Sequence, residues 1–176
     1  VMCGMGRTGA LFAGDVDGVT PDIVAIAKGL GAGYQPIGAM LCQDYIHNAI
    51  EHGSGFFQHG HTYLGHPIAA AAANAVLDRL VVDGLVDDVA QKGEYLKSQL
   101  RAKLGQHPHI GNIRGRGLFI GIEFVASQDD KTPSDPALNV AGNLKKNVFQ
   151  SGLACYPAQG TVDGRTGDHV LLAPPF

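Results

Sequence analysis

The sequence predicts a fold of the α/β class, and three observations support this prediction. Short apolar runs bounded by Pro and Gly are typical of strands, because both residues interrupt regular structure. Two longer stretches, at 67–82 and 85–104, have the residue types and spacing of helices. In the second half of the chain strands and helices alternate, which indicates an α/β or an α+β arrangement.

The first third of the chain is expected to contain two strands and one short helix. The first apolar run follows Pro21 and precedes a Gly-rich segment, so we expect a buried strand there. In order, the expected elements are a buried strand at 22–28, a strand at 37–42, a helix at 44–51 and an irregular loop at 56–65.

Two helices and a mixed C-terminal part are expected to follow. Pro67 suits the first turn of a helix, and the alanines after it have the highest helix propensity. Asp83 and Gly84 interrupt this helix, and the next one is amphipathic, with five apolar side chains on one face: Leu85, Val89, Leu96, Leu100 and Leu104. The remaining elements are expected to be a Gly-rich turn after Ile113, a strand at 118–124, a polar loop at 127–135, a helix at 139–151 and strands at 153–156 and 169–173.

The composition excludes several classes of protein. With 13 Lys and Arg against 16 Asp and Glu, the net charge of −3 excludes a strongly basic nucleic-acid surface. No apolar stretch approaches the roughly 18 residues of a membrane-spanning helix. Three widely spaced cysteines indicate free thiols in a reducing compartment, and we expect the cytoplasm. Charged residues make up only 16% of the 176, which favours a deep fold or a subunit interface.

Lys28 is the most informative single residue. It follows five uncharged residues, and the next lysine in the chain is Lys92. Apolar surroundings favour the neutral amine, which is the form that a Schiff-base lysine requires. The alternative is a lysine whose charged end reaches solvent from the end of a strand.

The Gly-rich segment after Lys28 is a weak phosphate-site candidate. Residues 29–38 contain four glycines, which permit a close approach of backbone N–H groups to an anion. The spacing matches neither a P-loop nor a dinucleotide-binding fingerprint. The alternative is a tight turn between two strands.

A His-rich loop contains a second candidate. The spacing of His59, His61 and His66 fits no standard zinc pattern, so we expect no metal site there. Thr62, in the same loop, offers a hydroxyl that can donate a hydrogen bond to a phosphate oxygen. The alternative is an ordinary loop threonine.

Arg165 is a candidate for binding a substrate carboxylate. It lies in a polar, Gly-flanked loop ahead of an apolar strand, and arginine binds carboxylates through two parallel hydrogen bonds. A flexible loop would let the guanidinium swing towards an acid and away from an apolar amine. The alternative is a solvated loop cation.

Five segments, each weak alone, are specific in combination. They are residues 2–9 (MCGMGRTG), 21–38 (PDIVAIAKGLGAGYQPIG), 59–67 (HGHTYLGHP), 114–123 (RGRGLFIGIE) and 167–175 (GDHVLLAPP). In this order and spacing the chain resembles the class III aminotransferases, the pyridoxal-phosphate enzymes that include ω-amino acid:pyruvate, ornithine and 4-aminobutyrate transaminases. The resemblance covers nearly the whole chain.

The resemblance implies the α/β fold type I of PLP-dependent transferases, which is aspartate aminotransferase-like. Residues 1–80 would be the C-terminal part of the large PLP-binding domain, 81–104 a connecting helix, and 105–176 an incomplete small C-terminal α/β domain. The chain would then be a piece of a longer protein, because the family's Asp-Glu pair would precede Val1. The piece alone is expected to bind cofactor poorly and to be inactive.

The resemblance also implies roles for three residues. Lys28 matches the lysine that holds pyridoxal 5'-phosphate as an internal aldimine. Thr62 matches the threonine that reaches the cofactor phosphate of the neighbouring subunit. Arg165 lies near the mobile arginine that some ω-transaminases use for the substrate carboxylate.

The implied function is transfer of an amino group from an amine or ω-amino acid to a 2-oxo acid such as pyruvate, by a homodimer. No metal, nucleic-acid or membrane partner is expected. A decarboxylase, racemase or aminomutase on the same fold stays open, because each uses the same lysine. A non-catalytic interaction module also stays open, although such a module has no chemical need for Lys28 and Thr62.

Overall fold

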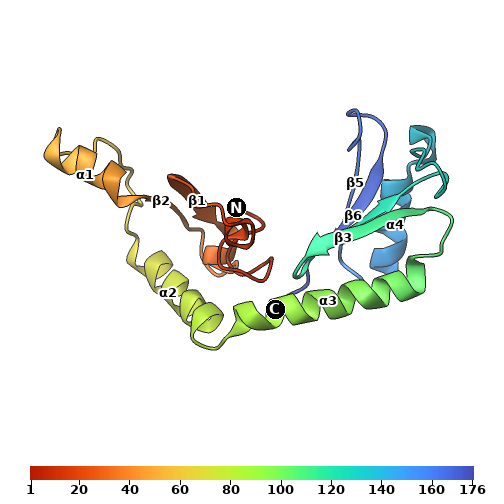
Figure 1. The fold of residues 1–176 in the computed structure, drawn as a ribbon, viewed down its shortest axis with the longest axis horizontal. Coiled ribbons are helices and arrows are strands. Elements are labelled where there is room, and N and C mark those ends of the chain that lie inside the picture. The colour runs from red at the N-terminus through yellow and green to blue at the C-terminus, as the bar shows by residue number, and fades with distance from the viewer. The chain divides into compact units, whose positions relative to one another are not determined.

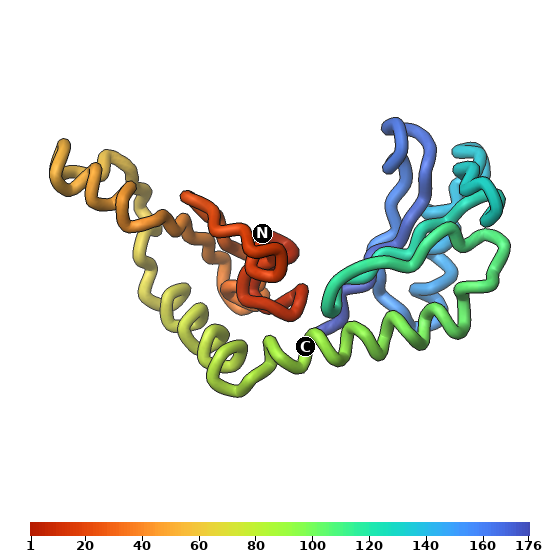
Figure 2. The backbone as a smooth tube through the Cα atoms, viewed as in Figure 1, coloured from red at the N-terminus to blue at the C-terminus, as the bar shows by residue number.

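The computed structural model describes residues 1–176, and the chain forms two compact units. Unit 1 is Val1–Asp87 and unit 2 is Asp88–Phe176. Figure 1 shows the elements of each unit, and Figure 2 traces the backbone through them. The boundary lies within the segment 81–104 that the sequence predicts as a connecting helix, and the predicted assignment to a large and a small domain stays a prediction.

Unit 1 contains a two-stranded sheet and two α-helices. In chain order its elements are η1 (Ala13–Asp17), β1 (Ile23–Ala27), η2 (Lys28–Leu30), β2 (Gly38–Cys42), α1 (Asp44–His52) and α2 (Pro67–Val81). The residues from 53 to 66 form no helix or strand, in agreement with the loop predicted at 56–65. Both predicted strands and both predicted helices of this part are therefore found.

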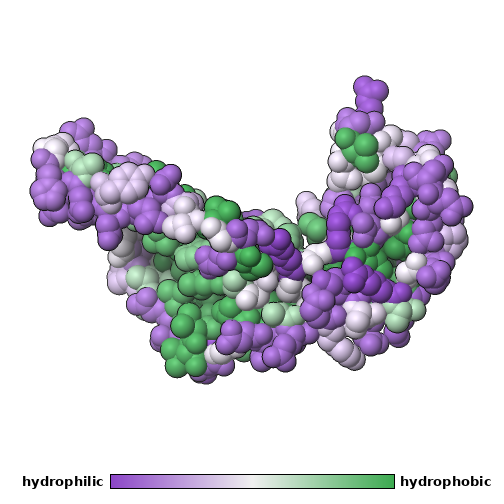
Figure 3. All heavy atoms as spheres, viewed as in Figure 1, coloured by the Kyte–Doolittle hydropathy of each residue, from purple (hydrophilic) through white to green (hydrophobic).

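The strands β1 and β2 pair antiparallel, with Ile23 opposite Cys42 and Ala27 opposite Gly38. The expected burial of the first strand is wrong, since Ile23 is 56% exposed and no residue of β1 is fully buried. The physical reason is that β1 has one neighbouring strand only, so much of its apolar surface has nothing packed on it. Figure 3 shows apolar side chains gathered on the surface of unit 1.

Helix α2 begins as the sequence predicts. Pro67 occupies its first turn, and His66 caps it, with Nδ1 accepting a hydrogen bond from Ala69 N at 3.4 Å. Its buried side chains are Ala69, Ala73 and Leu80, so the small alanines let the helix approach its neighbours closely. No helix of the chain is long and apolar enough to cross a membrane.

Unit 2 is built on a four-stranded antiparallel sheet in the order β3-β4-β6-β5. Its elements are α3 (Leu85–Leu104, which starts just before the boundary), β3 (Ile110–Arg116), β4 (Phe119–Phe124), η3 (Pro136–Leu138), α4 (Val140–Gln150), β5 (Tyr156–Gln159) and β6 (Asp168–Leu172). Helix α3 coincides with the predicted helix at 85–104, and α4 and β6 lie within one residue of their predicted bounds.

Two strands differ from the prediction. The sequence does not predict β3, because Gly, Asn and Arg interrupt the alternation of apolar residues in it. Only Ile110 and Ile113 of this strand are buried. The predicted bounds 153–156 of the next strand are also wrong. The observed strand, β5, begins at Tyr156 and contains Pro157. A proline is tolerated there because β5 is an edge strand.

One apolar cluster holds unit 2 together. Ile110, Ile113, Ile120, Ile122 and Val170 are at most 5% exposed. Leu96, Leu100 and Leu104 from α3 and Leu144 from α4 pack against it, so both helices cover the same face of the sheet. The predicted apolar face of the helix at 85–104 is confirmed, and Val89 on that face is fully buried.

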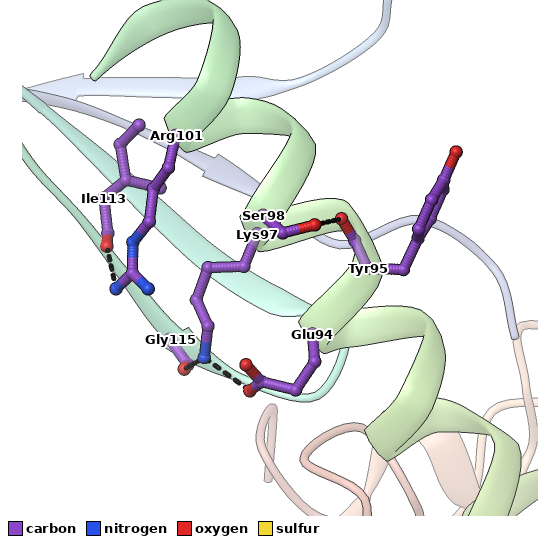
Figure 4. A network of polar contacts seen from close by, with 7 residues as sticks. All are labelled: Glu94, Tyr95, Lys97, Ser98, Arg101, Ile113 and Gly115. Atoms are coloured by element: carbon purple, nitrogen blue, oxygen red, sulfur yellow. Dashed lines mark hydrogen bonds and ion pairs between the residues drawn. The ribbon is translucent and has the colours of Figure 1, made fainter. Parts of the chain in front are cut away.

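Helix α3 also binds the outer edge of the sheet through polar contacts (Figure 4). Lys97 Nζ donates to the carbonyl of Gly115 at 3.2 Å, and Arg101 Nη2 donates to that of Ile113 at 3.1 Å. Glu94 accepts from Lys97 Nζ at 2.6 Å. Carbonyls two residues apart point to the same side of a strand, so one turn of helix satisfies two acceptors of β3.

The close packing of α3 on the sheet depends on Gly93. Gly93 is buried, and a Cβ built there would overlap the backbone of Gly117, in the turn between β3 and β4. The helix and the turn therefore approach as closely as two backbones can, and no side chain fits between them.

We predict that Gly93→Ala destabilises the protein, although alanine favours a helix by about 1 kcal/mol. The overlap with Gly117 must be relieved by moving backbone, so the free energy of unfolding should fall by about 1–3 kcal/mol in denaturant titrations. Gln91→Ala, at an exposed position of the same helix, is the control and should change it by less than about 0.5 kcal/mol. An unchanged stability of Gly93→Ala would contradict the packing described.

Candidate functional site

Lys28 lies at a strained position of the backbone. It begins η2 immediately after β1 ends at Ala27, and its φ is 50°. The left-handed region costs a residue with a Cβ about 1–2 kcal/mol. A strained backbone conformation persists only where the surrounding structure holds it, and such conformations are common at functional sites.

The turn after Lys28 supplies this enforcement. The backbone N–H of Gly31 donates to the carbonyl of Lys28 at 3.1 Å, and that of Tyr34 donates to Gly31 at 2.8 Å. A Cβ on Gly31 would lie 2.5 Å from the carbonyl oxygen of Gln35, so only glycine fits. Leu30 is 5% exposed and anchors the turn in the unit.

The side chain of Lys28 is exposed and has no hydrogen bond or ion pair in the structure. The geometry is that of a lysine reaching outwards from the end of a strand, which is the alternative that the sequence left open. The predicted apolar surroundings are absent, because β1 itself is only partly covered. An amine without a partner is free to react with or bind a ligand.

A cavity of about 430 Å³ lies beside β1. It is lined by the N-terminal residues, by η1, by β1 up to Ala27 and by the end of β2. Lys28 is not among the lining residues, although its neighbour Ala27 is. The lining contains the apolar residues Val24, Ile26 and Leu41 and, in addition, the three aspartates Asp15, Asp22 and Asp44.

Thr62 lies in the loop between α1 and α2, at the start of a turn. Leu64 N donates to the carbonyl of His61 at 3.0 Å, and His66 N donates to that of Tyr63 at 3.2 Å. The Thr62 side chain is exposed and without a partner. No group of three His, Cys, Asp or Glu residues comes together anywhere in a way that could hold a metal ion.

Arg165 lies in unit 2, on the hairpin between β5 and β6, whereas Lys28 and Thr62 both belong to unit 1. Its guanidinium is exposed and has no hydrogen bond or ion pair. The three predicted site residues thus share one property. Each presents an unpartnered polar group on an element end or a turn.

Two carboxylates around Arg165 were not foreseen. Asp163 accepts hydrogen bonds from the backbone of the hairpin tip. Asp168 is 1% exposed at the start of β6, and its Oδ1 accepts from Ala141 N in the first turn of α4 at 3.2 Å, while Oδ2 has no partner. Asp163-Gly164 is a turn signal that could have indicated the first. Nothing local indicates a helix cap from 27 residues away.

The family of the chain follows from its sequence together with this fold. Residues 1–170 match the family described as aminotransferase class-III. The chain belongs to the class III aminotransferases. The resemblance inferred from the five sequence segments is thereby confirmed.

Relatives and solved structures agree with this assignment. Over its whole length, this chain is 47% identical to an aminotransferase of Schizosaccharomyces pombe and 44% identical to one of Gibberella zeae. It covers 38% and 35% of those proteins. An amine transaminase from an uncultivated Pseudomonas species, solved in its PLP-bound form, superimposes with a TM-score of 0.87 at 35% identity, over 99% of this chain and 38% of the other. The predicted fold of the PLP-dependent transferases is therefore confirmed.

We predict that the strain at Lys28 can be measured with two variants. Lys28→Gly should have a free energy of unfolding about 1 kcal/mol higher than Lys28→Ala, because only the alanine keeps a Cβ at a left-handed φ. At Lys92, in the middle of α3, the order should reverse, since glycine is less favourable than alanine in a helix by about 1 kcal/mol. The same order at both positions in denaturant titrations would argue against a strained Lys28.

Proposed function

We propose that this chain carries the cofactor lysine of a pyridoxal-phosphate-dependent aminotransferase, and that Lys28 is that lysine. The observation that carries the proposal is an amine without a partner at a strained residue, immediately after a strand. Membership of the class III family supports it, as does the PLP-bound form of the similar Pseudomonas transaminase. The reaction would move an amino group from an amine or ω-amino acid to a 2-oxo acid such as pyruvate.

The chemistry of the available donors fits pyridoxal phosphate. The primary amine of Lys28 suits attachment to an aldehyde, and the hydroxyl of Thr62 suits donation to a phosphate oxygen. Neither group is engaged by the protein's own residues. Pyridoxal phosphate, when bound, supplies an electron sink for negative charge that develops on the substrate carbon.

The residues of the chain would act in sequence. Lys28 Nζ would hold the cofactor until a substrate amine binds, and its own amine would then be free. The free amine of Lys28 would act as a general base that removes the proton from the substrate carbon, and the ammonium so formed would act as the acid that returns it to the cofactor's C4′. The guanidinium of Arg165 would bind the carboxylate of the acid substrates through two parallel hydrogen bonds.

The assembly proposed is a homodimer in the cytoplasm. Unit 1 exposes large apolar side chains, including Ile23, Met40 and Tyr34, which the rest of a longer protein or a second subunit would cover. Thr62 would then reach the cofactor phosphate of the neighbouring subunit. The three cysteines are free thiols, which agrees with a reducing compartment.

We predict that Lys28→Ala abolishes covalent labelling by the cofactor. The enzyme that contains this chain is incubated with pyridoxal phosphate, reduced with borohydride and analysed by peptide mass spectrometry. The pyridoxyl group should be found on Lys28 in the unaltered protein and in the control Lys103→Ala, an exposed lysine of α3. A label of normal stoichiometry on another lysine of the Lys28→Ala protein would refute the assignment.

We predict that Thr62→Ala weakens binding of pyridoxal phosphate about tenfold to a hundredfold. One hydrogen bond to a charged phosphate contributes about 1.5–3 kcal/mol, and each 1.4 kcal/mol is a factor of ten. Thr62→Ser keeps the hydroxyl and should bind nearly as the unaltered protein does. The dissociation constant is measured by titrating cofactor-free protein and following the cofactor absorbance.

The contribution across the subunit interface has its own test. When Thr62→Ala and Lys28→Ala subunits are mixed, the site that retains Lys28 receives its threonine from the Lys28→Ala partner. One site per heterodimer should then bind the cofactor with unaltered affinity. If affinity does not recover, Thr62 serves its own subunit.

A further inference from the structure

The hairpin tip that carries Arg165 is tied together by its own backbone. Gly160 N donates to the carbonyl of Gly167 at 2.9 Å, where the two strands separate. Within the tip, Val162 N donates to Thr166 at 3.0 Å and Gly164 N donates to Gly160 at 3.0 Å. These bonds constrain the backbone of the tip, whereas the side chain of Arg165 has no such contact.

Asp163 is the centre of this arrangement. Its Oδ1 accepts the backbone N–H of Thr166 at 2.6 Å and that of Arg165 at 2.9 Å. These bonds, the one from Thr166 first, lower the pKa of the Asp163 carboxyl below its usual value of 3.8, and the Thr166 hydroxyl contributes in the same direction. Because the folded pKa is lowered, the bonds are fully present above the ordinary value and are lost only in stronger acid.

The neighbouring carboxylate does not neutralise the arginine. Asp163 is two residues from Arg165, yet the two side chains form no ion pair, and the guanidinium has no other partner. Asp163 is bound to the backbone of Arg165 instead. An arginine held in this way keeps all its donors available for an incoming carboxylate.

We propose that Asp163 is a positioning residue for Arg165, which fixes the backbone from which the guanidinium extends and leaves the guanidinium itself unpaired. The proposal rests on the proposed role of Arg165 in binding substrate carboxylates. It limits the motion of Arg165 to changes of side-chain rotamer. Asp163 thereby contributes to the preference for acids over simple amines without touching the substrate.

The test compares Asp163→Ala, Asp163→Asn and Arg165→Ala in the enzyme loaded with pyridoxal phosphate. The single-turnover half-reaction is followed by cofactor absorbance, with alanine as the acid and isopropylamine as the simple amine. Asparagine keeps the acceptor Oδ1, so Asp163→Asn should behave as the unaltered protein. Asp163→Ala should weaken apparent binding of alanine about tenfold, leave its maximal rate within about twofold, and leave isopropylamine unchanged.

A second measurement reports the geometry without any reaction. Amide hydrogen exchange at Arg165 and Thr166 should become faster in Asp163→Ala and stay slow in Asp163→Asn, because only the alanine removes the acceptor. Unchanged exchange in Asp163→Ala would overturn the proposal.

The remaining outcomes separate this proposal from the one on which it rests. If Arg165→Ala weakens alanine selectively while Asp163→Ala does not, Asp163 has no positioning role and the carboxylate role of Arg165 stands. If Arg165→Ala affects alanine and isopropylamine equally, the carboxylate role itself is overturned. If Asp163→Ala weakens both substrates equally, Asp163 only maintains the fold of the hairpin.

Discussion

The register of β1 on β2 is the constraint on which the candidate site depends. With Ala27 opposite Gly38, residues 28–37 must reverse the chain within a few ångströms of the strand ends. Lys28 is the first residue of that reversal, and its backbone is left-handed. A shift of one residue would move every β1 side chain to the other face and put a different residue at the turn. The position of the amine is thus a property of the sheet.

The two units are stabilised in different ways. Unit 2 buries a contiguous apolar cluster between one face of its sheet and two helices. Unit 1 buries only scattered side chains, such as Met5, Leu30 and Leu80, and leaves large apolar residues of both strands at its surface. Hydrophobic burial is the main favourable term in folding. Unit 1 therefore leaves apolar surface uncovered, whereas unit 2 buries a core of its own.

The elements that depend on local sequence pattern are predictable from the sequence. The helix at 85–104 and its buried face are predictable, because leucines three to four residues apart lie on one face of a helix. The strand before Lys28 was also found, since Pro21 and Gly29 bracket it. The burial of that strand was not predictable, because it depends on how many strands lie beside it. The role of Asp168 is not predictable for a similar reason. Its partner Ala141 in α4 is distant in sequence, and only the fold brings the two residues together.

The contacts of Lys97 and Arg101 with β3 have a consequence for how the protein behaves in a concentrated solution. The outer edge of a sheet is a template on which a strand of another molecule can assemble, and this is how many aggregates begin. At β3, side chains of α3 already occupy two of the carbonyls that a new strand would need. At the opposite edge, Pro157 removes an N–H from β5. Both edges of the four-stranded sheet therefore disfavour the addition of a strand from another molecule.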